Sequence, residues 1–256
     1  MHLLLEELTR VEARAQAPET LLILPVGATE QHGPHLPVGV DAYTVTHIAR
    51  EAATALQGQL PVLVAPTLPF GSSHHHLPFG GTMSLSTETY YRVLMDLIES
   101  CIVSGFRRIF VLNGHGGNNE LIQLAVRDLA LKHPVQLAAA SYWTIAWNAL
   151  IAAEAHLHGG LPGHSGIFET SLMLALRPEL VREPRPHRDA PEGTAPQGLM
   201  PYRAELHGSW QRIDGYTDSP DQANAKLGEH YLAVIVQAVA QALTEFCELA
   251  QGSDVP

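Results

Sequence analysis

The stretch LLILPVGATEQHGPHLPVGVD, residues 21–41, places a short apolar run directly before a loop crowded with side chains that bind metals or protons. Residues 21–26 are rich in Leu, Ile and Val, which is typical of a buried β-strand. Gly27 allows the chain to turn, and residues 42–57 then repeat apolar positions every three or four residues, as an amphipathic helix does. The stretch therefore predicts a buried strand, a polar loop and a helix in succession.

The same succession of patterns recurs along the chain. Alternating strands and helices are typical of a mostly parallel sheet with helices on both faces, and the functional site of such a sheet lies beyond the carboxyl ends of its strands. We therefore predict an α/β fold, a three-layer α/β/α sandwich around a central, mostly parallel sheet. The further predicted elements are strands at 61–66, 108–113 and 135–141 and helices at 87–104, 119–132 and 222–249.

The composition fits one compact domain over residues 1–256. Hydrophobic residues make up 46% of the chain and charged residues 16%, so the chain is apolar enough to bury a core. The proline-rich segment 182–221 interrupts the strand and helix pattern. We expect it to be an irregular excursion that covers a face or a site, and not a second domain.

The charge balance limits the classes of partner. The chain has 15 basic and 26 acidic residues, a formal net charge of -11, and no basic cluster, which argues against nucleic acid or an anionic membrane as the main partner. The N-terminus MHLLLEELTR lacks the pattern of a secretory signal, and no run approaches the eighteen apolar residues of a membrane span. Cys101 and Cys247 lie in apolar, helix-like sequence and are expected to be buried thiols. We expect a cytoplasmic protein that acts on small molecules or peptides.

Three groups of polar side chains are predicted to meet at one edge of the sheet. Mixed carboxylate and imidazole ligands suit zinc, manganese or iron, and a bridging carboxylate can hold two such ions about 3.5–4 Å apart. A single histidine in a loop is more often a surface or hydrogen-bonded residue, but three groups at equivalent positions favour a metal site. The groups are Glu30, His32, His35 and Asp41 after the first strand, Asn113, His115 and Asn119 around the end of the third, and His164 and Glu169 at the start of an amphipathic segment.

Several other residues have a structural explanation beside a functional one. Three consecutive histidines at 74–76 often bind metal weakly or stay solvated, so most of the three are not expected to be ligands. Trp143 follows the fourth strand and could form a wall of the pocket, although aromatic residues there more often pack in the core. Glu120 stands at a helix start, where the helix dipole alone favours an acid. The segment NGHGGN resembles a phosphate loop but lacks its lysine and spacing.

Four blocks of sequence together resemble the creatininase family of metal-dependent amidohydrolases. The blocks occur in the family's order over residues 24–176, and the E-Q-H-G and N-G-H-G-G-N motifs are specific to the family. The blocks are LPVGATEQHGPHLPVGVD, GSSHHHLPFGGTMSLS, VLNGHGGNN and GHSGIFETSLMLAL.

The resemblance implies a site for two divalent metal ions. It implies a homo-oligomer as well, often a hexamer in the family. It makes His164 the acid/base group that protonates the departing nitrogen, and it singles out His76 among the three consecutive histidines. The metal ligands that it implies are Glu30, His32, Asp41 as the bridging group, and His115.

One position departs from creatininase itself. Creatininase has a glutamate two residues after the histidine that matches His115, whereas this chain has Gly117. Glu169 is the expected replacement ligand. The glycine version resembles relatives that hydrolyse formamides or process the mycofactocin precursor peptide, so the substrate of this chain stays open.

We expect a hydrolase that cleaves the C–N bond of a small cyclic or linear amide or formamide through a hydroxide bridging two Zn, Mn or Fe ions. The alternatives are a mycofactocin-type peptidase, a metal-binding protein without catalysis, or a sugar isomerase. The expected catalytic residues are His164 and Glu120, and the expected substrate-binding residues are His76, Trp143 and Asn113.

Overall fold

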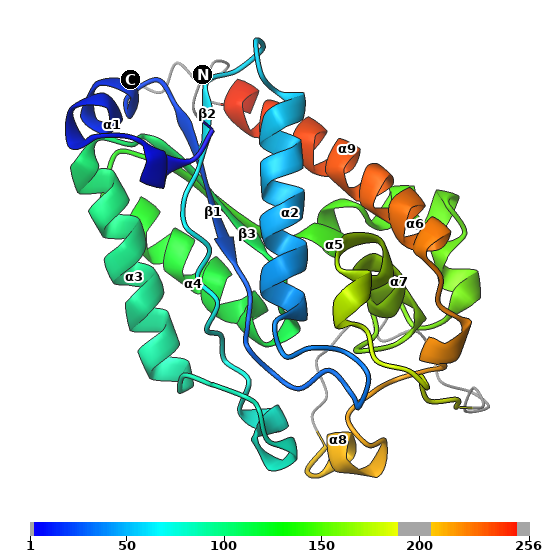
Figure 1. Cartoon of the computed structure of the whole chain (residues 1–256). Helices are drawn as coiled ribbons and strands as arrows, with labels where there is room; N and C mark the ends of the chain where they lie inside the picture. Colours follow the sequence, from blue (N-terminus) through cyan, green and yellow to red (C-terminus); the bar gives the residue numbers. More distant parts are fainter. Residues whose placement is uncertain (1–2, 189–205, 250–256) are drawn as a thin grey trace.

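The computed structural model describes residues 3–188 and 206–249. Within these residues a four-stranded parallel sheet forms the middle layer, with the strand order β2-β1-β3-β4 (Figure 1). The strands are β1 (Leu21–Val26), β2 (Val62–Val64), β3 (Arg108–Asn113) and β4 (Gln136–Ser141).

The helices pack on both sides of this sheet (Figure 1). The α-helices are α1 (Arg10–Gln16), α2 (Val40–Ala55), α3 (Thr87–Ser104), α4 (Asn119–Ala130), α5 (Tyr142–Ile145), α6 (Trp147–Ala152), α7 (Ile167–Leu176), α8 (Ser209–Arg212) and α9 (Ala225–Leu249). Short 3₁₀ helices near the site are η2 (His74–Phe79), η3 (Gly116–Asn118) and η4 (Ala155–His158).

Alternate residues of β1 face opposite layers of the molecule. Leu21 and Ile23 pack with α2 and α9, whereas Leu22 and Leu24 pack with α3 and α4. A parallel strand buried on both faces has to be apolar throughout, which explains the unbroken run LLILPV. The two cores confirm the predicted three-layer α/β/α sandwich.

The predicted elements lie close to the observed ones. The strands at 21–26 and 108–113 have the predicted bounds, while the second strand is shorter than 61–66 because only Val62–Val64 pairs with β1. Ser86 caps α3 through a hydrogen bond that its hydroxyl accepts from the backbone N–H of Thr89 at 3.2 Å. Asn118 occupies the N-cap of α4, but its side chain makes no capping bond and donates instead to the carbonyl of Gly27 at 3.1 Å.

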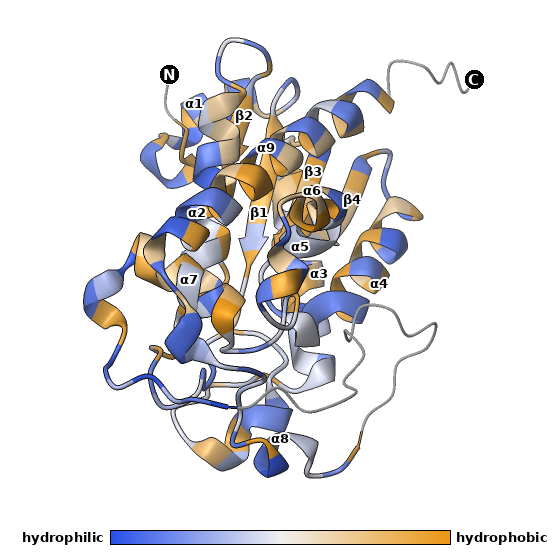
Figure 2. Cartoon of the chain, turned by 90° about the vertical axis from the view of Figure 1, so that its right-hand side faces the viewer, coloured by the Kyte–Doolittle hydropathy of each residue, from blue (hydrophilic) through white to orange (hydrophobic). Residues whose placement is uncertain are grey.

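Helix α9 is long and apolar enough, by length and composition, to cross a membrane. The core offers another explanation, because α9 buries Tyr231, Ile235 and Val239 in the cluster that it shares with α2 and α7. The other positions of α9 include hydrophilic residues, so the helix carries both polar and apolar residues along its length (Figure 2). A core helix of a folded domain passes the same test of length and composition.

Where the structure describes it, the proline-rich excursion contains the short helix α8 between stretches without a further α-helix or strand. Of the predicted segment 182–221, residues 189–205 lie outside the described residues. The described part includes α8, which lies beside η2 at the end of the molecule toward which β1 points (Figure 1). The excursion therefore reaches the end of the sheet where the site was predicted.

Candidate metal centre and active site

The candidate site lies at the carboxyl ends of β1 and β3. Val26 pairs with Asn113 in the sheet register, so the loops that follow these two strands leave the sheet side by side. Glu30 and His32 lie in the first loop and His115 in the second. All three side chains are buried.

Gly27 lets the first turn of α2 pack directly against the end of β1. A Cβ atom at this position would lie 2.9 Å from the backbone nitrogen of Ala42, so a larger residue would push the helix away. Asp41 belongs to that first turn. The close packing therefore carries the Asp41 carboxylate to the strand end.

The start of α7 supplies a third group of side chains. The Glu169 carboxylate is buried and accepts a hydrogen bond from the backbone N–H of Ser165 at 2.5 Å. Ser165 has a φ of 56°, which is uncommon for a residue other than glycine. The preceding residue, His164, is held by its backbone N–H, which donates to Thr217 at 3.0 Å.

The Asp41 carboxylate spans two donor groups. Its Oδ1 lies 3.2 Å from Nε2 of His32, and its Oδ2 lies 3.2 Å from Nδ1 of His115. Nδ1 of His115 also lies 3.2 Å from Oε1 of Glu30. Nε2 of His32 also lies 3.7 Å from Oε2 of Glu169. One donor group therefore contains Glu30 and His115, the other contains His32 and Glu169, and Asp41 joins them.

The arrangement of the donor atoms fits metal binding better than hydrogen bonding among the donors. Oε2 of Glu30, Nε2 of His32 and Oδ2 of Asp41 are buried and have no hydrogen-bond partner of acceptable geometry. Leaving such atoms unpaired is costly. Two ligands bound to one zinc ion at about 2.1 Å stand roughly 3–3.5 Å apart, which is the separation seen on both sides of Asp41. The residues present therefore fit a pair of divalent cations.

Hydrogen bonds orient the two histidines for this role. Nδ1 of His32 lies 3.1 Å from the carbonyl of Glu30, and Nε2 of His115 lies 3.1 Å from the carbonyl of Ser72. A carbonyl can only accept, so these ring nitrogens carry the protons. In the neutral form of each ring, the opposite nitrogen has a lone pair that faces the carboxylates, as in metal-binding histidines.

The pKa shifts of the donors reflect the negative charge of the buried carboxylates. Burial lowers the pKa of His32, but the carboxylates of Asp41 and Glu169 outweigh it and raise this pKa to about 10. Glu30 and Asp41 likewise raise the pKa of His115 well above its ordinary value, against the effect of burial. Burial raises the pKa of Glu169 to about 7. A cation bound between these side chains would compensate the same negative charge and would release their protons.

Gln31 links two further histidines beside the metal ligands. The side-chain Nε2 of Gln31 lies 3.0 Å from Nδ1 of His76 and donates to the carbonyl of Gly215 at 2.8 Å. The main-chain carbonyl of Gln31 lies 3.0 Å from Nε2 of His164. The rings of His76 and His164 stack with centroids 4.3 Å apart. Burial lowers the pKa of His76 to about 3 and that of His164 well below its ordinary value, so both rings are neutral. Sequence reasoning missed Gln31, whose only signal is its place between two predicted ligands.

Trp210 of α8 covers the histidine cluster. Its ring centroid lies 4.8 Å from that of His76 and 5.2 Å from that of His164, with both pairs edge to face. Sequence reasoning did not identify Trp210, although it predicted that the excursion carrying this residue would cover a face or a site. Trp210 lies in the described part of that excursion, and the covering role of the whole segment stays a prediction.

The other predicted site residues lie outside this cluster or support it. Trp143 is buried in the core against Tyr142, with centroids 4.9 Å apart, so packing accounts for it and its substrate role stays a prediction. Asn113 holds the loop of His115, because its side chain donates to the carbonyl of His115 at 2.6 Å and accepts from the backbone N–H at 3.1 Å. Glu120 is exposed in the first turn of α4, and its catalytic role stays a prediction. His35 lies 2.8 Å from the hydroxyl of Thr170.

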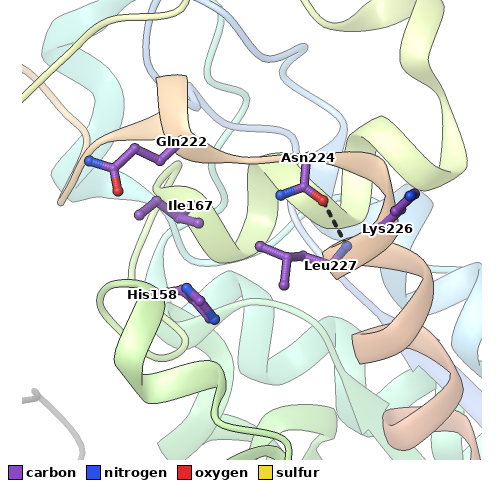
Figure 3. A pocket seen from close by; sticks show the side chains of 6 residues that line it. All are labelled: His158, Ile167, Gln222, Asn224, Lys226 and Leu227. Atoms are coloured by element: carbon purple, nitrogen blue, oxygen red, sulfur yellow. Dashed lines mark hydrogen bonds between the residues drawn. The ribbon is translucent and has the colours of Figure 1, made fainter.

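A separate cavity of about 330 Å³ lies where η4 and the first turn of α7 meet the start of α9 (Figure 3). Within it, the backbone N–H of Leu227 donates to the side chain of Asn224 at 3.0 Å, which caps α9 (Figure 3). None of the candidate metal ligands lines this cavity. The lining residues are His158, Ile167, Gln222, Asn224, Lys226 and Leu227.

The fold and this donor set define the chain as a creatininase-family amidohydrolase. The sequence model of the creatininase family, described as creatinine amidohydrolase, matches residues 6–243, so the chain belongs to that family. This confirms the resemblance found in the four sequence blocks.

Known relatives support the same assignment. Creatinine amidohydrolase of Pseudomonas putida is 32% identical over 250 residues, which are 91% of this chain and 92% of the relative. The mycofactocin precursor peptide peptidase of Mycobacterium ulcerans (strain Agy99) is 36% identical over 174 residues, which are 65% of this chain and 63% of the peptidase.

Solved structures agree over almost the whole chain. A crystal structure of creatinine amidohydrolase (creatininase) matches with a TM-score of 0.79 and 33% identity, and covers 95% of this chain and 98% of its own. A zinc–zinc form of a creatininase variant and a manganese form of creatininase match at 32% identity and a TM-score of 0.79, each covering 96% of this chain and 98% of its own. A creatininase variant complexed with creatine matches at 32% identity and a TM-score of 0.80, covering 96% and 99%.

Proposed function

We propose that the chain hydrolyses the C–N bond of a small amide at a centre of two divalent metal ions. The observation that carries this proposal is the Asp41 carboxylate, whose two oxygens face His32 on one side and His115 on the other at 3.2 Å each. The zinc–zinc and manganese forms of similar creatininases support the same class of cofactor. Carboxylate and imidazole donors admit zinc, manganese and iron alike.

The residues would divide into two ligand sets joined by Asp41. Glu30 and His115 would hold one ion, and His32 and Glu169 the other. Such ions, when bound, lower the pKa of water and polarise a substrate carbonyl. The roles of Glu30, His32, Asp41, His115 and Glu169 as ligands follow the donor geometry and the family resemblance.

His164 would move the proton to the departing nitrogen. Its Nε2 donates to the carbonyl of Gln31, so Nδ1, which faces Glu30 at 3.8 Å, is the nitrogen that can take up and release a proton. Burial holds the pKa of this imidazole well below its ordinary value. The ring is therefore neutral, and Nδ1 is free to accept a proton from the attacking water and then pass it to the departing nitrogen, as a general base followed by a general acid.

Trp210 and His76 would form the substrate-side wall. Their rings meet edge to face next to His164. An aromatic wall with few polar groups excludes water and fits a small, flat or compact amide. The creatine complex of a similar creatininase supports a substrate of this size.

Replacement of Asp41 by Ala tests the proposal. Loss of the bridging carboxylate should remove both ions and abolish hydrolysis, which inductively coupled plasma mass spectrometry and an amide panel would measure. Asp96→Ala is a matched control, because Asp96 is exposed on α3. Unchanged metal content in Asp41→Ala would refute the bridging role.

A second candidate function is cleavage of a short precursor peptide by the same metal chemistry. The 36% identity to the mycofactocin precursor peptide peptidase favours it. A panel of creatinine, formamidopyrimidine-type amides and short peptides separates the two candidates. Turnover of peptides alone would move the assignment to a peptidase, whereas bound metal without turnover of any member would favour a non-catalytic metal protein or a sugar isomerase.

We also propose a homo-oligomer in the cytoplasm. The oligomer follows from the family resemblance, and light scattering of the purified protein measures its mass. A mass of one chain at working concentration would contradict it. The location rests on Cys101 and Cys247, which are free thiols as in a reducing compartment, and stays a prediction that fractionation of cells would test.

A further inference from the structure

The backbone of Ser72, which begins the segment Ser72–His75, and the ring of His115 fill the space that a side chain at position 117 would need. A Cβ atom on Gly117 would lie 2.2 Å from the carbonyl oxygen of Ser72 and 2.5 Å from Nε2 of His115. A residue other than glycine at this position would therefore displace backbone and the candidate ligand together. No ligand can come from position 117 while the segment stays where it is.

The same segment is fixed tightly to the His115 loop. The backbone N–H of Ser72 donates to the side chain of Asn118 at 3.1 Å, and the hydroxyl of Ser73 lies 3.1 Å from Nε2 of His115. Ser73 is fully buried. The position of the following residues, which begin η2, is thereby set relative to His115.

His75 follows directly and faces the first donor group. A ring nitrogen of His75 lies within 4.8 Å of ligand atoms of both Glu30 and His115, so the three residues could hold one ion. The rings of His75 and His115 are nearly parallel, at 3°, with centroids 5.9 Å apart. His75 is half-buried, and its ring also packs against that of His76, with centroids 4.2 Å apart.

The neighbouring His76 is excluded from this role by its tautomer. Gln31 is oriented by Gly33, whose backbone N–H donates to its oxygen at 2.9 Å, and by Gly215, whose carbonyl accepts from its nitrogen at 2.8 Å. The amide nitrogen lies 3.0 Å from Nδ1 of His76 and 3.1 Å from Nε2 of His164. Because Nε2 of His164 donates to the main-chain carbonyl of Gln31 and cannot accept, the remaining amide hydrogen goes to Nδ1 of His76. A neutral imidazole that accepts at Nδ1 carries its proton on Nε2. The Nε2 atom of His76, 3.7 Å from Glu30, has then no lone pair for a metal.

We propose that His75 is a metal ligand at the Glu30 and His115 position, where it supplies the donor that glycine at 117 cannot. This inference rests on the proposed two-metal site. With His75, the first ion has four protein groups, namely Glu30, Asp41, His75 and His115. The second set, His32, Asp41 and Glu169, has three protein groups, the number found in zinc sites that keep a position for water or substrate.

Metal content and metal affinity of the full chain test the proposal. Wild type, His75→Ala and His74→Ala would be stripped with chelator, reloaded with Zn²⁺, and measured by mass spectrometry and by competition with a chromogenic chelator. His74 is the matched control, because it is exposed one residue earlier and bonds Ser84 at 2.8 Å. We expect two equivalents in wild type and His74→Ala, and in His75→Ala either one equivalent or a second equivalent bound at least about tenfold more weakly.

The outcomes separate this proposal from the proposed function. Two equivalents with unchanged affinity in His75→Ala would overturn the role of His75 and leave the two-metal site standing. Absence of zinc binding by wild type would overturn the two-metal site itself, and the role of His75 with it. If His75→Ala does not fold, His75→Gln keeps the bulk of the side chain. The rise in melting temperature on adding Zn²⁺ should then be smaller than in wild type, and an equal rise would contradict the proposal.

Discussion

Nε2 of Gln31 lies 3.0 Å from Nδ1 of His76, and the backbone carbonyl of the same glutamine lies 3.0 Å from Nε2 of His164. One residue therefore determines which nitrogen is protonated in the first ring through its side chain and in the second through its main chain. The main-chain contact survives substitution, whereas the side-chain contact does not. The side-chain amide also lies 3.1 Å from Nε2 of His164, so a substitution of Gln31 changes the surroundings of both rings without replacing a candidate metal ligand.

Replacement of Gln31 by Leu should lower kcat by about 10- to 100-fold and leave metal content unchanged. Without the amide, Nδ1 of His76 loses its donor and the ring can adopt either tautomer. Steady-state kinetics and metal analysis measure the two effects. Gln31→Asn is the conservative comparison, and loss of metal in Gln31→Leu would indicate a role in binding the ions instead.

Replacement of Trp210 by Ala should raise KM for a small amide and leave the metal content intact. The ring packs edge to face on His76 and His164, and removing it opens the site to water. Trp210→Phe keeps an aromatic wall and should restore most of the affinity. A lowered kcat with unchanged KM in Trp210→Ala would show that the ring acts on the histidines and not on the substrate.

Replacement of Gly27 by Ala should destabilise the protein by about 1–3 kcal/mol, the usual cost of overpacking a close contact. The new methyl group would lie 2.9 Å from the backbone nitrogen of Ala42 and push away the turn that carries Asp41. Urea unfolding measures the loss of free energy of unfolding. Gly116→Ala is the control, because a Cβ atom there meets nothing within 4 Å, and equal losses in both variants would refute the steric explanation.

The free energy of unfolding should fall as the pH drops from 6.5 to about 4. In this range His35 binds a proton in the unfolded protein but not in the folded protein. Burial, with a contribution from the charge of Arg185, lowers the pKa of His35 from 6.5 to about 4. Between these values the unfolded state holds more protons than the folded state, so the free energy of unfolding rises with pH. At about 1.4 kcal/mol per pKa unit, the full effect is about 3 kcal/mol.

The contribution of His35 can be isolated by difference. Urea unfolding of wild type and His35→Gln between pH 4 and pH 7.5 removes the contributions of all other titrating groups. The stability of wild type relative to the variant should decrease as the pH falls from 6.5 to 4 and stay constant above 6.5. Parallel curves for the two proteins would contradict the lowered pKa.

The sequence was sufficient for the layers and for the location of the site. Strands buried on both faces are apolar throughout, so a run such as LLILPV at 21–26 can be recognised as a strand from the sequence alone. The carboxyl ends of parallel strands meet at one edge, which brings Glu30 and His115 together whatever the details of the loops.

Contacts between distant segments could not be predicted in the same way. Trp210 reaches the site from an irregular excursion without periodicity, and no local pattern fixes where such a segment goes. The orientation of His75 and His76 depends on the turn of η2 and on Gln31, 45 residues before His76. The burial of Trp143 depends on the way α5 packs against α9, which its own sequence does not encode.

The cover of the site and its ligand cage belong to different parts of the chain. The donors sit on strand ends and helix starts within the first 176 residues, whereas Trp210 arrives on a proline-rich stretch after them. The same stretch also holds parts of the site, because the Gly215 carbonyl accepts from Gln31 and the Thr217 hydroxyl accepts from the backbone N–H of His164. A substitution at Trp210 would change the cover alone, whereas a rearrangement of residues 215–217 would also shift Gln31 and His164.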